Sequence, residues 1–524
     1  MSKSFAKATI WVTVSEIIFN ISGFVIHSVV GRILGPADYG RYGLVVTLTT
    51  MVIILIGNGI PTAMSKYISE IFESNPRMVG IIKRQAIILQ SIIIGSITVL
   101  FFLSAPLISK ILGDPTLTPL FQISTLIIPA FAAASFYFSY FTGLHEFGIQ
   151  SILKITRSVL RLIFIIALAY YFKLKGSIVG YIMAPGILFF IGYAIDKIRI
   201  SPKIKAKEIE LENCHPGLDP TSNEIAKISM LDSRLRGNDN KMPDDITFDW
   251  KKLVNYAWQI VIFFLAYELL ISIDLYLVKG ILKDDYLTGI YNAALTIGRI
   301  PYYIFYALTV VLLPVISKTT AEKNHTKAGE IVNQTLRLML VLLVPSVILM
   351  SVFSAPIIKL FYSSRYIDAA APMSVLVWGV GFLTIYYVFC FVMSGAGKVK
   401  IPMILSIFGL AVNTILNYFL IKKYGIMGSA IATSIASAVV TFFMLYYVWR
   451  DFGVKIKLKS FLKISSAGLV VYAVSFFFSK GSLIFIPWSV ILFVFYLIIL
   501  YTLREIKKED LQFLARSFGF KKNK

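Results

Sequence analysis

A few charged side chains interrupt the long apolar stretches of this sequence, and three of them are arginines: Arg157, Arg161 and Arg299. An arginine keeps its charge at physiological pH, so inside a membrane it needs an anion, water or backbone carbonyls as a partner. A phosphate group is such an anion, because the planar guanidinium can bind two of its oxygens. We therefore predict that these arginines bind an anionic substrate, with Arg299 as the first candidate. An ion pair of Arg299 with Glu268 or Asp274 is the structural alternative.

The spacing of these residues predicts that they share helix faces. Lys154, Arg157 and Arg161 follow one another at intervals of three and four residues, which places them on one side of a helix. Lys154 can extend to the membrane interface, so we expect it to contribute little. Asn292 and Arg299 are two helical turns apart on another helix. Asn292 is therefore a second candidate for substrate contact on that helix.

A third polar face is expected near the N-terminus, where Glu16, Asn20, Gly23 and His27 are spaced by four, three and four residues. Glu16 and His27 are candidates for ion coupling, since a carboxylate and an imidazole can both exchange protons in a carrier. The alternative is a hydrogen-bonded seam between helices.

Glu268 and Asp274 are the other two candidates for ion coupling, by H⁺ or Na⁺. We expect no other cofactor: the sequence lacks a nucleotide-binding Walker pattern, and Cys214-His215 lacks a second pair of metal ligands nearby. The tyrosine pairs 302–303 and 386–387 could stack on sugars, but we favour a role as anchors at the membrane interface.

Composition dictates where these residues must be placed. Of the 524 residues, 57% are hydrophobic and 15% are charged, whereas a soluble domain carries about 25% charged residues. The surplus apolar residues must therefore face lipid. We predict fourteen transmembrane helices near 8–34, 42–65, 79–103, 117–142, 150–172, 176–196, 253–279, 287–316, 327–353, 370–395, 399–421, 426–449, 460–479 and 482–503.

The basic residues predict how these helices are oriented. When the 51 lysines and arginines are assigned to the nearest loop, 38 fall on one side of the membrane and 12 on the other. The positive-inside rule then places both termini in the cytoplasm and the protein in the cytoplasmic (inner) membrane. Basic residues concentrated in the cytoplasmic loops also account for the net charge of +23. We therefore expect no nucleic-acid partner.

Parts of the sequence recur about 250 residues later, which predicts a duplication. Gly31, Gly40 and Tyr42 recur 249 residues on, and a second group recurs 252 residues on. The pairs are Gly31/Gly280, Gly40/Gly289, Tyr42/Tyr291, Gly143/Gly395, Ile152/Ile404, Leu153/Leu405, Gly176/Gly428 and Ser177/Ser429. Six helices per unit is an even number, so both units insert in the same direction.

The duplication predicts an all-α membrane fold of two parallel six-helix bundles followed by two further helices. The expected domains are an N-terminal bundle (1–196), a cytoplasmic linker (197–252), a C-terminal bundle (253–449), and two helices with a basic tail (450–524). Within the linker, 214–241 resembles a translated bacterial repeat element, which we expect to be a tolerated, disordered insert.

Several motifs together resemble the Wzx-type polysaccharide flippases of the MOP (multidrug/oligosaccharidyl-lipid/polysaccharide) exporter superfamily. They are GRILGPADYGRYG at 31–43, SKY at 65–67, GIYNAA at 289–294, RIP at 299–301, LPVIS at 313–317 and GSAIAT at 428–433. The resemblance implies a V-shaped, MATE-like pair of bundles around a central cavity. It implies a non-enzymatic flippase that moves polyprenyl-pyrophosphate-linked oligosaccharide by alternating access, for surface polysaccharides such as O-antigen. Membrane lipids and polysaccharide-assembly proteins are the further partners it suggests.

Three other functions remain as alternatives. A flippase for the lipid-linked peptidoglycan precursor belongs to the same superfamily. A MATE-type multidrug exporter is less favoured, because the buried arginines would repel organic cations. A membrane-embedded polysaccharide polymerase is the least favoured, since the predicted outer loops are all short.

Overall fold

The computed structural model describes residues 3–57, 59–72, 75–213, 250–322, 325–454, 458–478 and 483–505. The predicted insert at 214–241 lies outside these ranges. Throughout the described part the fold is helical and contains no strand, as the sequence predicted.

In the described part of the N-terminal half there are eight α-helices. They are α1 (Lys3–Leu34), α2 (Pro36–Gly57), α3 (Ile60–Ile71), α4 (Pro76–Ile111), α5 (Thr118–Ser124), α6 (Ile127–Gly143), α7 (Phe147–Ile195) and α8 (Ser201–Asn213). A short 3₁₀ turn, Pro115–Leu117, precedes α5, and a π-helical turn, Asp196–Ile200, joins α7 to α8.

The C-terminal half resumes after the linker. Its helices are α10 (Trp250–Leu282), α11 (Asp285–Gly298), α12 (Ile300–Ala321), α13 (His325–Val352), α14 (Ser354–Phe361), α15 (Ala370–Gly395), α16 (Lys400–Phe452), α17 (Leu458–Ser475) and α18 (Phe485–Thr502). A 3₁₀ segment, Ser364–Ala369, connects α14 to α15.

The helices have the length and apolar character of a multi-pass membrane protein. Eight segments of the described chain are long and apolar enough to cross a membrane, and they include α4, α7, α16 and α18. Both α7 and α16 coincide with two predicted spans and a break between them. The total of fourteen spans stays a prediction.

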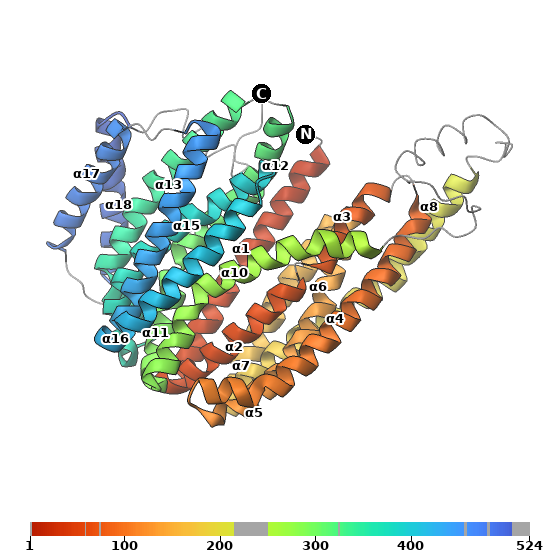
Figure 1. Cartoon of the computed structure of the whole chain (residues 1–524), viewed down its shortest axis with the longest axis horizontal. Helices are drawn as coiled ribbons and strands as arrows, with labels where there is room; N and C mark the ends of the chain where they lie inside the picture. Colours follow the sequence, from red (N-terminus) through yellow and green to blue (C-terminus); the bar gives the residue numbers. More distant parts are fainter. Residues whose placement is uncertain are drawn as a thin grey trace.

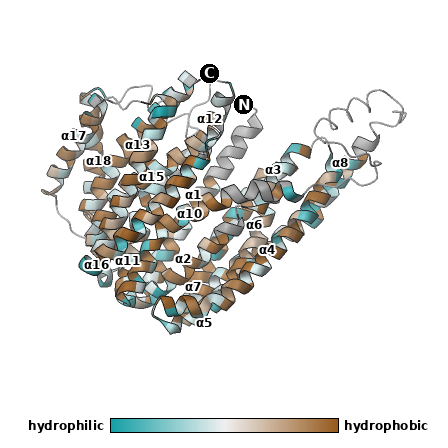
Figure 2. Ribbon diagram, viewed as in Figure 1, coloured by the Kyte–Doolittle hydropathy of each residue, from teal (hydrophilic) through white to brown (hydrophobic). Residues whose placement is uncertain are grey.

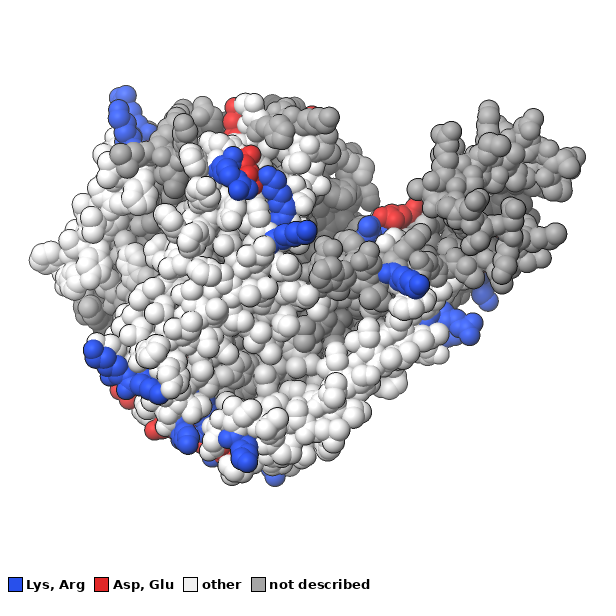
Figure 3. Space-filling view, in the orientation of Figure 1, with Lys and Arg blue, Asp and Glu red and all other residues white. Residues whose placement is uncertain are grey.

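The surface agrees with a membrane environment. Large apolar side chains are exposed along α4, α7 and α16, and brown residues dominate the outside of the bundles in Figure 2. On the face shown in Figure 3, lysines and arginines gather toward opposite ends of the molecule and leave a broad uncharged band between them.

The kinks in α7 and α16 show the duplication in the backbone itself. Lys173 has φ 52° and ψ −132°, and Gly425 has φ 58° and ψ −140°. These two residues are 252 positions apart, the offset of the repeat. Just beyond them, a Cβ on Gly176 or on Gly428 would lie 2.0 Å from the carbonyl oxygen of the residue eight positions before it. The same turn is therefore built twice.

The two halves meet at another pair of repeated glycines. A Cβ on Gly40 of α2 would lie 2.7 Å from the amide nitrogen of Gly289 in α11, and one on Gly289 would lie 1.7 Å from the carbonyl oxygen of Pro36. Only glycine permits this approach of two backbones. Figure 1 shows the bundles converging at this end and diverging toward the end where α1 begins and α8 lies.

Candidate functional site between the two halves

A cavity of about 610 Å³ lies between the two bundles. The N-terminal half contributes residues of α1, α2, α6 and α7 to its wall, and the C-terminal half contributes residues of α10, α11, α12 and α15. This volume is in the range of pockets that enclose a drug-sized molecule.

The wall formed by α7 is cationic. Arg157 is 6% exposed, and its guanidinium carbon lies 4.6, 4.9 and 5.2 Å from the ring centroids of Phe19, Phe138 and Phe131. Rings at this distance stabilise a cation without neutralising it. Lys154 also lines the cavity, so our expectation that it would contribute little missed its place in the wall.

Arg161 lies one helical turn further along α7. Its guanidinium stacks on Phe19 and Tyr181, with ring centroids 5.0 and 5.1 Å away, and one Nη donates a hydrogen bond to the Tyr181 hydroxyl at 3.4 Å. The Tyr42 hydroxyl donates to that same oxygen at 3.3 Å. The Nε of Arg161 is buried and makes no hydrogen bond within the described chain. Arg161 therefore carries a buried donor that no group of the described chain satisfies.

Arg299 lies at a break between two helices within the predicted span 287–316. It caps the C-terminus of α11, and α12 begins at Ile300 with Pro301 in its first turn. A guanidinium nitrogen of Arg299 donates to the backbone carbonyl of Ile271 on α10. In the described structure Arg299 forms no direct ion pair with Glu268 or Asp274, although both are near enough to attract its charge.

The two carboxylates of α10 occupy different surroundings. Glu268 lines the cavity. Asp274 is fully buried behind the wall, where it accepts hydrogen bonds from the Tyr291 hydroxyl at 2.9 Å, the Thr433 hydroxyl at 3.1 Å and the Leu275 amide at 2.8 Å. These three donors satisfy the carboxyl oxygens of Asp274 where no water reaches them, and they offset part of the cost of burying the group.

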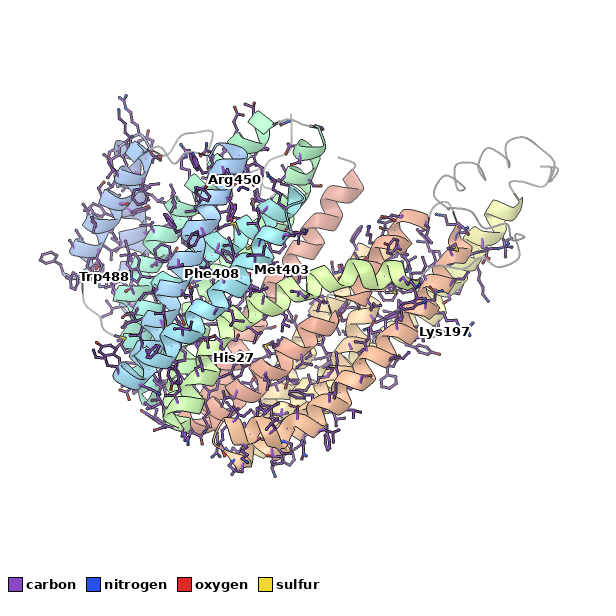
Figure 4. The ribbon with its side chains drawn as sticks, viewed as in Figure 1. His27, Lys197, Met403, Phe408, Arg450 and Trp488 are labelled. Atoms are coloured by element: carbon purple, nitrogen blue, oxygen red, sulfur yellow. The ribbon has the colours of Figure 1, made fainter. Side chains whose placement is uncertain are left out.

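His27 and Asn292 lie beside a cluster of buried tyrosines. The Nδ1 of His27 is 3.0 Å from the Tyr39 hydroxyl, which is 2.8 Å from the Tyr362 hydroxyl. The Asn292 amide donates to the Tyr39 carbonyl at 3.3 Å and packs against Gly43. Figure 4 shows His27 near the level at which the bundles converge.

The structure thus brings most of the predicted residues to one cavity. Its lining includes Arg157, Arg161, Arg299, Asn292, His27 and Glu268, together with Asn20 and Gly23. Asp274 lies outside the lining, and the side chain of Glu16 is outside the described residues.

An ion-pair network at the converging end was not predicted. Arg41 lies 2.8 Å from Asp285 and 3.5 Å from Asp114, while Lys279 lies 3.3 Å from Asp114 and also pairs with Asp285. Arg41 and Asp114 come from one half, and Lys279 and Asp285 come from the other. The network therefore ties the halves together at the closed end of the V.

The charges of this network stabilise the ionised form of Asp114. Partial burial raises the pKa of this carboxyl, but the hydrogen bond from Thr116 and the charges of Lys279 and Arg41 lower it more. The resulting pKa lies below the ordinary value of an aspartate.

Tyrosines also line the C-terminal wall: Tyr267, Tyr302, Tyr303 and Tyr387. We favoured the membrane interface for 302–303 and 386–387, and three of those four residues contribute to the cavity instead. The sequence positions of these tyrosines did not indicate that they line a cavity, because their rings meet only when α10, α12 and α15 pack together.

Comparisons with known proteins find two family models along the chain. Residues 5–211 match the family model described as polysaccharide biosynthesis protein, and residues 259–419 match the MatE family model. The chain is 24% identical to the stage V sporulation protein B of Bacillus subtilis over 97% of both chains. It is 22% identical to the lipid II flippase MurJ of the same organism, over 85% of this chain and 83% of that protein.

Among solved structures, an inward closed conformation of the lipid II flippase MurJ aligns with a TM-score of 0.69 at 18% identity, covering 95% of this chain and 99% of that one. An inward-facing MATE-family multidrug resistance transporter aligns with a TM-score of 0.62 at 13% identity, covering 85% and 98% of the two chains. The helical fold, the cavity between two related halves and these matches agree: the chain belongs to the MOP exporter superfamily.

Proposed function

We propose that this protein is a flippase that moves a lipid-pyrophosphate-linked oligosaccharide across the cytoplasmic membrane for surface polysaccharide synthesis. The observation that carries the proposal is the cationic wall of α7, where Lys154, Arg157 and Arg161 face a cavity that also contains Arg299. Arginine suits a pyrophosphate, since its fixed fork of donors matches phosphate oxygens.

Alternating access is the mechanism that this geometry supports best. The bundles are joined at one end by the packing of Gly40 on Gly289 and by the ion-pair network around Arg41. Opening that end and closing the other would move a bound head group from one leaflet to the other without covalent chemistry. We therefore propose a transporter rather than an enzyme, with its termini in the cytoplasm.

Ion coupling is part of the proposal, with H⁺ or Na⁺ as the driving ion. Glu268 is a cavity-facing carboxylate close to Arg299. Protonation of Glu268, or binding of Na⁺ to it, would therefore alter the attraction between the cavity and an anionic substrate. Asp274 is the alternative carboxylate. Glu268→Gln and Asp274→Asn separate the two in vesicles with an imposed H⁺ or Na⁺ gradient: the coupling residue is the one whose replacement removes the gradient dependence.

A flippase for the lipid-linked peptidoglycan precursor is the second candidate. The similarity to the Bacillus subtilis protein named lipid II flippase favours it. Both candidates require a pyrophosphate site, so the cationic wall supports either one.

The test is rescue of bacterial strains that lack their own flippase, one for polysaccharide units and one for the peptidoglycan precursor. We expect the wild type to restore export in the polysaccharide strain. Arg299→Ala should lower export at least about tenfold, which corresponds to about 1.4 kcal/mol, and Arg299→Lys should restore part of it. Arg450→Ala is the matched control, because Arg450 pairs with its neighbour Asp451 at the end of α16.

The outcomes separate function from site. Rescue of the peptidoglycan strain alone would favour the second candidate, and rescue of neither would overturn the flippase proposal. Normal export by Arg299→Ala would remove Arg299 from the site.

A further inference from the structure

We propose that the cavity tyrosines of the C-terminal half form a carbohydrate-binding surface, the tyrosine wall, defined as Tyr267, Tyr302, Tyr303 and Tyr387. This inference rests on the proposed function and assigns the sugar of the substrate to one side of the cavity. The cations of α7 would then hold the pyrophosphate on the other side.

The four rings are contiguous although they come from three helices. Tyr387 of α15 has its ring centroid 4.9 Å from that of Tyr267 in α10 and 4.8 Å from that of Tyr302 in α12. Tyr302 in turn lies 5.5 Å from Tyr303. All four contribute to the lining of the cavity. The wall is thus a continuous aromatic surface rather than a set of scattered rings.

Access to the wall is greatest at Tyr303. This residue is 42% exposed, whereas Tyr267 and Tyr387 are 1% and 4% exposed. Tyr267 and Tyr387 belong to the packed core of the C-terminal half and support the wall from behind. A ligand in the cavity would meet Tyr303 first and Tyr302 beside it.

The aromatic rings of the opposite wall are differently engaged. Phe19, Phe131 and Phe138 lie under the guanidinium of Arg157, and Phe19 also lies under Arg161. Those rings hold cations, while the tyrosines contact one another, mainly in edge-to-face and tilted arrangements. The two walls therefore differ in chemistry. On the α7 side the aromatic rings carry cations, and on the C-terminal side the rings contact one another, while Arg299 and Glu268 supply charge beside them.

A sugar ring matches the tyrosine wall in chemistry. Its C–H faces carry partial positive charge and pack against the negative face of an aromatic ring, and its hydroxyls bond to polar groups at the ring edges. Such groups are available nearby, because Asn292, Thr296 and Glu268 line the same cavity.

The size of the cavity limits what it can hold. A volume of about 610 Å³ suits a pyrophosphate with one or two sugars, and a longer glycan must extend beyond the cavity. The wall would therefore recognise the sugars nearest the pyrophosphate.

Binding measurements on the purified full-length protein in detergent micelles test this assignment. The two probes are geranyl methyl pyrophosphate and geranyl-pyrophosphoryl-N-acetylglucosamine, which are both pyrophosphate diesters of equal charge and differ in having a methyl group or a sugar. We expect the sugar to tighten binding to the wild type about fivefold to tenfold, as one or two ring contacts would. The doubly substituted Tyr302→Leu/Tyr303→Leu protein should lose this gain and keep its affinity for geranyl methyl pyrophosphate.

Two variants act as controls. Tyr303→Phe keeps the ring and should keep most of the gain. Tyr446→Leu removes an exposed tyrosine of α16 that is not part of the cavity lining, and it should behave as the wild type.

The results distinguish this proposal from the one on which it rests. A wild type that binds neither probe contradicts the pyrophosphate site and with it the proposed function. A wild type that binds both probes equally, or a double variant that keeps the full sugar gain, overturns the tyrosine wall alone.

Discussion

The two halves of the molecule place a polar cluster at the same position of the repeat, and the clusters carry opposite charge. In the N-terminal half, the Tyr42 and Tyr181 hydroxyls bond to each other, and Arg161 donates to Tyr181. The cluster has a cation at its centre, and that cation lines the cavity.

The counterparts in the C-terminal half are Tyr291, Thr433 and Asn413, at offsets of 249, 252 and 252 residues. Here Asn413 takes the place of the arginine, and the charge comes from Asp274, to which Tyr291 and Thr433 both donate. The charge is a carboxylate sealed inside the half.

This difference shows how duplication can separate two tasks. The scaffold of helices is the same, so each half offers a buried polar position at one level. The first half exposes its charge to the cavity, where it can bind an anion, and the second satisfies its charge internally, where it stabilises the packing of α10, α11 and α16.

The contact that joins the halves is the most sensitive point of the comparison. Gly289→Ala places a methyl group against the Pro36 carbonyl, and Gly40→Ala places one against the Asp285 carbonyl at 2.5 Å. We expect each change to lower the free energy of unfolding by about 3 kcal/mol, measured by thermal unfolding in detergent. Gly95→Ala is the control, because a Cβ there meets no atom within 4 Å. Equal stability of Gly289→Ala and Gly95→Ala would contradict the close contact.

Substitution of the two charges should affect different properties, stability for Asp274 and export for Arg161. Asp274→Ala leaves the hydroxyls of Tyr291 and Thr433 without their acceptor, so we expect a loss of about 2 kcal/mol in stability. Arg161→Met replaces a stacked cation with an apolar chain, so stability should change by less than about 1 kcal/mol while export falls. Thermal unfolding and the rescue assay should be run on both variants. An Arg161→Met protein that is less stable than the Asp274→Ala protein would contradict the comparison.

The ion pairs between the halves should add a smaller, pH-dependent stabilisation. Because the folded pKa of Asp114 lies below its unfolded value, its contribution is fully present above about pH 4 and is lost as the pH falls through the folded pKa. Asp114→Asn should therefore be less stable than the wild type by about 1 kcal/mol between pH 8 and pH 5. The difference should shrink below pH 4. If the stability difference between the wild type and Asp114→Asn grew on acidification, the pKa of Asp114 would be raised in the folded protein rather than lowered.

The smallest effect is expected at the repeated kinks. Lys173 adopts a backbone conformation that glycine adopts at the equivalent Gly425. Lys173→Gly should relieve strain and raise stability by about 0.5 kcal/mol, and Gly425→Ala should lower it by a similar amount. Unfolding midpoints of the two variants check this, and a destabilising Lys173→Gly would show that the lysine is held by contacts rather than strained.

Much of the fold follows from hydropathy and the repeat. The all-helical architecture and the breaks in α7 and α16 could be predicted, because a membrane requires long apolar helices and short polar turns. Most of the candidate site could be predicted as well, since charges such as Arg157 and Arg299 are too costly to face lipid.

Helical geometry explains why Asp274 lies away from the cavity. Glu268 and Asp274 are six residues apart, a rotation of about 240° around α10. They cannot point the same way, so Glu268 faces the cavity and Asp274 faces α11 and α16. Hydropathy alone treats them as equivalent.

By itself, the sequence determined that this chain is a duplicated helical membrane protein with cations at membrane depth, because each of these features is local or periodic. Only the tertiary structure decided which residues of different helices meet. The contacts of Arg41 with Asp285, of Gly40 with Gly289 and of Tyr302 with Tyr387 join segments far apart in the chain. Such pairings depend on how the helices cross, which no spacing within a single helix encodes.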